Sequence, residues 1–147
     1  MLAVLIVCTT LLGLTVLLHY EALCLLNARL AGMKVPHRTK MLVVIFSTFA
    51  AHAVEILLYG IGIYFLLTYF EVGSLSGPEG NSFAICLYFS AEAFSSLGLG
   101  DVVPFGPIRL LGGFEALNGL LLIAWSASYT YLAMERFWSD PVKHRPR

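Results

Sequence analysis

The chain has 147 residues, of which 59% are hydrophobic and only 12% are charged. Such a composition leaves too few polar side chains to cover a soluble globular domain of this size, so it predicts a membrane protein. Nine basic residues balance nine acidic ones, and the formal net charge of +0 gives no reason to expect a nucleic-acid partner.

The first expected element is a transmembrane helix over residues 1–26. This stretch is apolar except for His19 and Glu21, and at about 1.5 Å per residue it can cross a hydrocarbon core of roughly 30 Å. No basic residue precedes its apolar part, and it lacks a clear cleavage site of small residues. We therefore expect a helix that stays in the mature protein rather than a signal peptide.

Two further apolar stretches predict two more transmembrane helices, over residues 41–70 and 108–137. Each exceeds the hydrocarbon thickness as an uninterrupted helix, so each must tilt or protrude. Residues 27–40 are polar, contain four basic residues and include the helix-breaking Pro36. They are predicted to form a basic cytoplasmic loop between the first two helices.

The distribution of Lys and Arg predicts the orientation in the membrane. Four of the nine lie within residues 27–40, four more follow residue 135, and only Arg109 lies elsewhere. Because basic residues stay on the cytoplasmic side, the N-terminus is expected outside and the C-terminus inside. Residues 138–147 then form a short cytoplasmic tail, and residues 71–107 belong to the outer side.

The outer side contains a segment that is too short to span the membrane. Residues 71–82 are rich in Gly and Ser and predict a loop. Residues 83–94 are apolar and aromatic but only about a dozen in number, so they predict a half-helix that enters the membrane and returns. Irregular backbone at that depth must line protein or a water-filled cavity, and residues 95–101, SSLGLGD, follow at once.

Backbone carbonyl oxygens of several identical strands can replace the hydration shell of a cation in such a cavity. Successive carbonyls face one way only if alternate residues adopt dihedral angles that side chains resist. Gly98 and Gly100 permit those angles. The segment therefore predicts an ion-binding strand, and the half-helix before it would direct its negative C-terminal end toward the cation.

Residues 41–137 resemble the pore domain of the tetrameric potassium-channel superfamily. The segment from Asp101 to Pro104 is similar to the family's Asp-x-x-Pro turn. The family's filter reads T-V-G-Y-G-D, and the matching residues here are Ser96, Leu97, Gly98, Leu99, Gly100 and Asp101.

This resemblance implies an all-α membrane protein that assembles as a homotetramer, with three transmembrane helices, a re-entrant pore helix and a filter loop. It assigns an outer helix to residues 41–70, a pore helix to 83–94, a filter to 95–101 and an inner helix to 108–137. The helix over residues 1–26 is extra to this design. No cofactor is implied other than permeant K⁺ or Na⁺, and K⁺ would be bound by the backbone carbonyls of Ser96, Leu97, Gly98 and Leu99.

The implied function is passive conduction of potassium, with two departures from the family pattern. Leu99 stands where the family has an aromatic residue that braces the filter, and Ser96 replaces Thr. A weakly selective cation channel is therefore an alternative, and a nonconducting accessory subunit or a transporter component is an alternative of another class. Enzymatic activity is not expected, because no nucleophile and base, and no metal-ligand cluster, stand at workable spacing along the chain.

The resemblance also implies residues that support the filter, namely Ser95, Glu92 and Asp101. Glu92 matches a family position whose carboxyl contacts the filter aspartate from behind. Two carboxyls that close would share a proton. The alternatives for this pair are control of filter stability and a purely structural contact. Acidic residues near the outer side, which would attract cations to the mouth, are Glu71, Glu79, Asp101 and Glu115.

Three residues within the long helices are further candidates. Glu55 lies near the middle of the second span with His52 one turn before it, and an ionisable residue at this depth is a functional candidate by default. We favour a polar contact with His19, Glu21 or a neighbouring helix over a pH-sensing or gating role. Gly119 is a candidate gating hinge by resemblance, and tight helix packing is the favoured alternative.

The expected partners are other copies of the chain and membrane lipid, with a separate regulatory protein as a further candidate. The compactness of the chain suggests a bacterial inner membrane.

Overall fold

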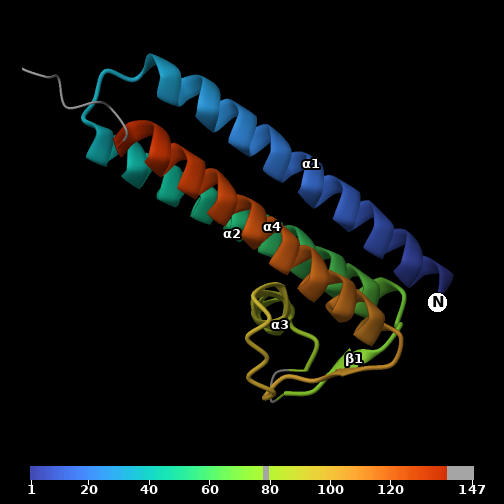
Figure 1. Cartoon of the computed structure of the whole chain (residues 1–147). Coiled ribbons are helices and arrows are strands. Elements are labelled where there is room, and N and C mark those ends of the chain that lie inside the picture. The colour runs from blue at the N-terminus through green and yellow to red at the C-terminus, as the bar shows by residue number, and fades with distance from the viewer. Residues whose placement is uncertain (78–79, 139–147) are drawn as a thin grey trace, which may run out of the picture.

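The computed structural model describes residues 1–77 and 80–138. Three long helices lie side by side, and a short helix packs near one end of them (Figure 1). The long helices are α1 (Leu2–Gly32), α2 (His37–Tyr69) and α4 (Ile108–Trp138), and the short helix is α3 (Phe83–Phe94). Each long helix is long and apolar enough to cross a membrane, which confirms the predicted all-α membrane architecture.

The predicted boundaries between the first two helices are wrong. The loop expected over residues 27–40 is only residues 33–36, because α1 continues to Gly32 and α2 begins at His37. Hydropathy marks where the apolar stretch ends, whereas a helix continues through polar residues until the backbone is interrupted. Pro36 supplies that interruption before α2, and Arg29 suits the last turn of α1 because it opposes the helix dipole.

The larger of two hydrophobic clusters among the described residues lies at the end of the bundle that holds α3. Buried side chains from all four helices meet there, and the largest include Tyr59 and Ile63 of α2, Phe94 of α3 and Ile108 of α4. Val4 of α1 joins the same cluster. The N-terminal part of α1 therefore lies beside the end of the bundle that holds the short helix.

Glycines let α2 and α4 approach α3 closely from two sides. A Cβ atom at Gly60 of α2 would lie 3.1 Å from the Cα atom of Leu87, and one at Gly119 of α4 would lie 2.0 Å from the carbonyl oxygen of Phe94. Close packing through small residues is the usual way that helices associate in a membrane. The short helix is thus held between two of the long ones.

A small antiparallel ribbon connects the segments on either side of α3. Its strands are β1 (Ser74–Leu75) and β2 (Pro104–Phe105), with Ser74 opposite Phe105. Next to the ribbon, the backbone N–H of Ser76 donates to the carbonyl of Val103 at 2.9 Å, and the N–H of Val103 donates to the Ser76 hydroxyl at 2.7 Å. The ribbon fixes the loop before α3 to the chain that leaves residues 95–101.

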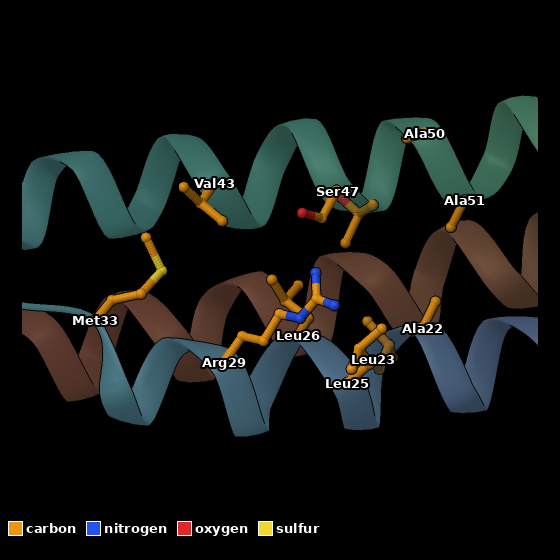
Figure 2. Close-up of a pocket in the computed structure, with 11 residues that line it drawn as sticks. Ala22, Leu23, Leu25, Leu26, Arg29, Met33, Val43, Ser47, Ala50 and Ala51 are labelled. Carbon is orange, nitrogen blue, oxygen red and sulfur yellow. The ribbon is translucent and has the colours of Figure 1, made fainter.

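A cavity of about 490 Å³ lies between α1 and α2 (Figure 2). Its lining residues belong to the part of the bundle that lies away from α3 (Figure 1). Its lining is mainly apolar and includes Met33, Val43 and Ala51, with the single charged side chain of Arg29. Because it lies away from residues 95–101, this cavity is not part of the candidate ion path.

Candidate functional site

The short helix α3 has a defined start and a defined end. Ser82 is its N-cap, and the Ser82 hydroxyl accepts a hydrogen bond from the backbone N–H of Ile85 at 3.3 Å. At the other end the Ser95 hydroxyl donates to the carbonyl of Ala91 at 2.6 Å. Residues 95–101 therefore begin directly at the C-terminal, negative end of a helix dipole.

The backbone after α3 has positive φ at every second residue. The φ angles are 56° at Ser96, 57° at Gly98 and 82° at Gly100. Glycine adopts such angles readily, whereas a serine does so uncommonly. Alternation of this kind is what directs successive carbonyl oxygens toward one side. The sequence indicated the two glycines, and the structure adds Ser96 to the same pattern.

Glu92 lies behind this backbone and contacts it directly. The side chain is buried, and its Oε1 atom accepts a hydrogen bond from the backbone N–H of Leu99 at 3.0 Å. Asp101 has a different partner, because its Oδ2 atom accepts from the hydroxyl of Tyr88 at 3.0 Å. The structure thus places the Glu92 carboxyl against the backbone of Leu99 and the Asp101 carboxyl against Tyr88. The two carboxyls have different hydrogen-bond partners, and a direct pairing with a shared proton stays a prediction.

Tyr88 is a site residue that the sequence analysis missed. Its hydroxyl donates to the Asp101 carboxylate, and a tyrosine hydroxyl is protonated at neutral pH, so this donor is present under ordinary conditions. Tyr88 stands four residues before Glu92, and residues at that spacing share one helix face. That spacing is a signal that could have identified it.

Glu115 does not lie where the sequence analysis placed it. We expected it among the acidic residues of the outer mouth, but its side chain is fully buried within the helix bundle. Its Oε1 atom lies 2.5 Å from the hydroxyl of Ser90 on α3, which also lies 2.8 Å from the carbonyl of Ile56 on α2. Glu71 and Asp101 are exposed, and Glu79 lies outside the described residues.

Gly119 packs directly against the backbone that precedes the candidate filter. The carbonyl oxygen, carbonyl carbon and Cα atom of Phe94 would lie 2.0, 2.8 and 3.0 Å from a Cβ atom at this position. This is the contact that the packing alternative predicts. A role of Gly119 as a gating hinge stays a prediction.

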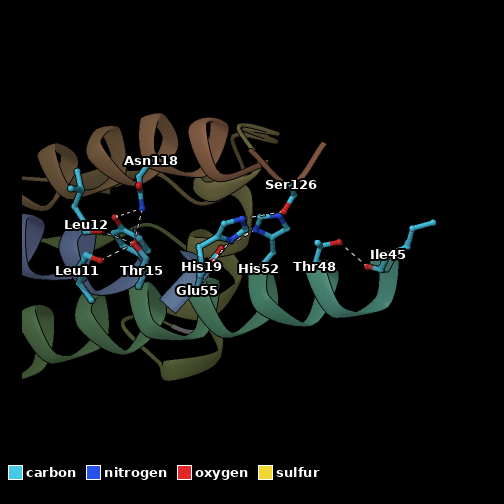
Figure 3. Close-up of polar contacts among 11 residues, drawn as sticks. Leu11, Leu12, Thr15, His19, Ile45, Thr48, His52, Glu55, Asn118 and Ser126 are labelled. Carbon is cyan, nitrogen blue, oxygen red and sulfur yellow. Dashed lines mark hydrogen bonds and ion pairs between the residues drawn. The ribbon is translucent and has the colours of Figure 1, made fainter. Parts of the chain in front are cut away.

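Glu55 is the centre of a polar cluster in the middle of the bundle (Figure 3). Its Oε1 atom lies 2.8 Å from Nδ1 of His19 on α1, and its Oε2 atom lies 2.8 Å from Nδ1 of His52. The polar contact with His19 that we favoured is therefore present, whereas Glu21 is exposed. A pH-sensing role for His52 and Glu55 stays a prediction.

The same cluster corrects one expectation. We expected no metal-ligand cluster from the spacing of residues along the chain, but His19, His52 and Glu55 each place a ligand atom within 4.8 Å of the others. His19 is far from the other two in sequence, so only the packing of α1 against α2 brings the three together.

Comparison with known proteins agrees with the geometry around residues 95–101. A family model described as "Ion channel" matches residues 41–136, which include most of α2, all of α3 and most of α4. Searches of curated proteins and of solved structures gave no match. Helix α1 lies outside the matched residues. Because the match covers more than half of the chain, the chain belongs to this ion channel family, in its two-span, potassium-channel type of pore domain.

Proposed function

We propose that the chain is the subunit of a homotetrameric, potassium-conducting channel whose ions pass between backbone carbonyls of residues 96–99. The observation that carries the proposal is the positive φ at Ser96, Gly98 and Gly100. It occurs directly after a half-helix whose negative end favours a cation.

Exposed apolar side chains support the assembly of several copies. In a single chain the side chains of Leu97 and Leu99 are 64% and 63% exposed. One chain supplies one strand of carbonyls, so a closed ring around an ion requires copies related by cyclic symmetry. Neighbouring copies would cover these two leucines and complete the ring.

Hydrogen bonds behind the filter support potassium selectivity even though the aromatic brace is absent. Leu99 has no polar side-chain atom, but Glu92 accepts a hydrogen bond from its backbone N–H, and Tyr88 fixes Asp101 two residues later. These contacts hold the backbone from behind, which a ring of carbonyls needs if it is to keep its spacing. The apolar Leu99 itself favours the second candidate, a weakly selective cation channel.

We further propose that the protein lies in a bacterial inner membrane, on the ground of its compactness, and that its N-terminus is outside, on the ground of the distribution of its basic residues. Three helices that can cross the membrane support an odd number of crossings. Accessibility of single engineered cysteines at each end to a membrane-impermeant thiol reagent tests the orientation.

Reversal potentials in planar bilayers test the function. With potassium on one side and sodium on the other, we expect a reversal close to the potassium equilibrium value. Clear current that reverses near zero would instead make this a nonselective pore, and recovery of selectivity in Leu99→Tyr would assign the cause to that residue. Absence of current from a stable tetramer would overturn the channel proposal in favour of an accessory role.

A matched pair of glycine substitutions tests the backbone geometry itself. Gly98 and Gly80 have φ angles of 57° and 59°, and a Cβ atom at either would meet nothing within 4 Å. Alanine is therefore equally strained at both, by about 1–2 kcal/mol, but only Gly98 lies in the filter. We expect Gly98→Ala to lose potassium current or selectivity and Gly80→Ala to keep both; equal behaviour of the two variants would contradict the proposed filter.

A further inference from the structure

We propose that His19, His52 and Glu55 form a binding site for a divalent transition-metal ion of the zinc type, which fastens α1 to the pore domain. This goes beyond ion conduction, because the ion would be held by side chains in the helix bundle rather than pass between backbone carbonyls. Figure 3 shows the three side chains together, with His19 coming from α1 and the other two from α2.

The ligand atoms are already close to the separation that a metal ion needs. Nδ1 of each imidazole lies 2.8 Å from a different oxygen of the Glu55 carboxylate, and one ligand atom from each residue lies within 4.8 Å of the others. Ligands of a tetrahedral zinc ion, at about 2.0–2.2 Å from the metal, lie roughly 3.4 Å from one another. Small rotations of the three side chains therefore open space for an ion at the centre.

The donor set selects the class of metal. Two imidazole nitrogens and one carboxylate oxygen suit Zn²⁺ and its neighbours among the divalent transition metals, whereas Mg²⁺ and Ca²⁺ prefer oxygen ligands alone. His52 and Glu55 are three residues apart on one helix and so share a face. Cores of helix bundles build metal sites in this way, from such a pair and ligands on a facing helix.

An outer contact of His19 is an independent observation for the site. Its second ring nitrogen, Nε2, lies 3.2 Å from the hydroxyl oxygen of Ser126 on α4. If Nδ1 binds a metal, Nε2 must carry the ring proton, and this N–H then donates a hydrogen bond to the hydroxyl oxygen of Ser126. Histidines that bind metals almost always have such a partner, which fixes the ring and its tautomer.

Burial gives the carboxylate a reason to bind a cation. The side chains of Glu55 and His19 are fully buried, and that of His52 is 17% exposed. A buried carboxylate is destabilised unless a positive charge compensates it, and a divalent ion supplies that charge. Trp125 packs on His19 with ring centroids 5.4 Å apart and completes an apolar surrounding.

The position of the site gives the bound ion a consequence for the filter. The ring of His52 lies 5.7 Å, centroid to centroid, from that of Phe94, the last residue of α3. An ion that fixes His52 would therefore also fix the end of the pore helix from which the candidate filter begins. The site would hold α1, α2 and α3 in one arrangement.

Metal binding to the untagged, detergent-purified full chain tests the proposal without reference to ion conduction. After treatment with a chelator, we titrate Zn²⁺ by calorimetry and record the visible absorption of added Co²⁺. We expect one Zn²⁺ per chain and the strong ligand-field bands of tetrahedral Co²⁺. His52→Gln and Glu55→Gln should each weaken binding at least 10-fold, and Ser126→Ala should weaken it about 10- to 100-fold.

The control is the double variant His37→Gln with His144→Gln, which removes the other two histidines of the chain and should bind Zn²⁺ as the unmodified protein does. Size-exclusion elution and far-UV circular dichroism identify any variant that fails to fold. Because the His52 side chain is partly exposed, His52→Gln is the ligand substitution that should disturb folding least. The proposal is overturned if the unmodified protein binds no stoichiometric Zn²⁺, or if folded His52→Gln binds it equally well. The cluster would then be a hydrogen-bonded contact only.

Discussion

Gly119→Ala is the substitution for which the structure gives the most direct magnitude. The added Cβ atom would lie 2.0 Å from the carbonyl oxygen of Phe94, whereas ordinary contacts of this kind are near 3.4 Å. All three of its nearest atoms belong to the Phe94 backbone, so no side-chain rotation can relieve the overlap. Instead α4 and the end of α3 must separate by more than 1 Å.

We expect this separation to destabilise the protein by about 1–3 kcal/mol, the usual range for overpacking a well-packed site. Gly13→Ala is the control, because a Cβ atom at Gly13 of α1 would meet nothing within 4 Å. At that position alanine is the better helix former and should leave stability unchanged or raise it by up to about 1 kcal/mol. Unfolding of both variants in detergent, followed by circular dichroism against denaturant, measures the difference.

The same experiment separates the two roles considered for Gly119. If it serves only as a hinge, Gly119→Ala unfolds like the unmodified protein and changes only channel opening. If its role is close packing against Phe94, stability falls whether or not channels open. Equal stability of Gly119→Ala and Gly13→Ala would refute the packing argument.

Three further substitutions follow from the site. Tyr88→Phe removes the hydrogen bond to Asp101, and we expect it to lower the stability of the protein by about 1 kcal/mol. A double-mutant cycle with Asp101→Asn measures the coupling free energy, and a value of zero would contradict the interaction. Ser96→Gly relieves the strain of a positive φ of 56° at a serine, so the free energy of unfolding should rise by about 1 kcal/mol and the thermal midpoint should rise with it. A lower thermal midpoint would show that the serine angle is not strained. Ser90→Ala removes the hydrogen-bond partner of the buried Glu115 carboxyl and should lower stability by about 1–3 kcal/mol, while adding Glu115→Leu should recover much of that loss.

The helices were predictable because length and apolar content decide whether a segment can cross a membrane. Helix α3 spans Phe83–Phe94, as predicted for the half-helix, and Ser82 caps its start. The end of α1 was not predictable in this way. Its last residues, up to Gly32, are polar enough to leave the apolar stretch but still form a regular helix.

The backbone of the candidate filter, residues 95–101, was predictable at its glycines and not at Ser96. Gly98 and Gly100 indicate positive φ because glycine adopts it without strain. A serine carries no such signal, so its φ of 56° follows from its neighbours rather than from its own preference. Two hydrogen bonds to the end of α3 hold the backbone at this position. The N–H of Ser96 donates to the carbonyl of Ala93, and the N–H of Leu97 donates to the carbonyl of Glu92.

The partners of buried polar residues were the least predictable part of the site. Glu115 lies early in the last helix, and its position in the sequence suggested the outer mouth, yet it points into the bundle against Ser90. His19 was one of several partners considered for Glu55. Apolar residues lie on every face of α1, so its sequence does not show which face packs against α2 or in which register.

Polar side chains provide the register that apolar residues cannot. In lipid, a leucine gains little by contacting another helix instead of an acyl chain, so apolar contact alone does not fix how α1 sits on its neighbours. His19 of α1 contacts Glu55 of α2 and Ser126 of α4, and the Asn118 amide of α4 donates to Thr15 of α1 at 2.8 Å. A rotation or a slide of α1 by one turn would break all three contacts at once and leave buried polar groups unpaired. The helix that lies outside the ion channel family match is therefore fixed in one position on the pore domain, and its His19 stacks on His52, whose ring lies 5.7 Å from that of Phe94 at the end of α3.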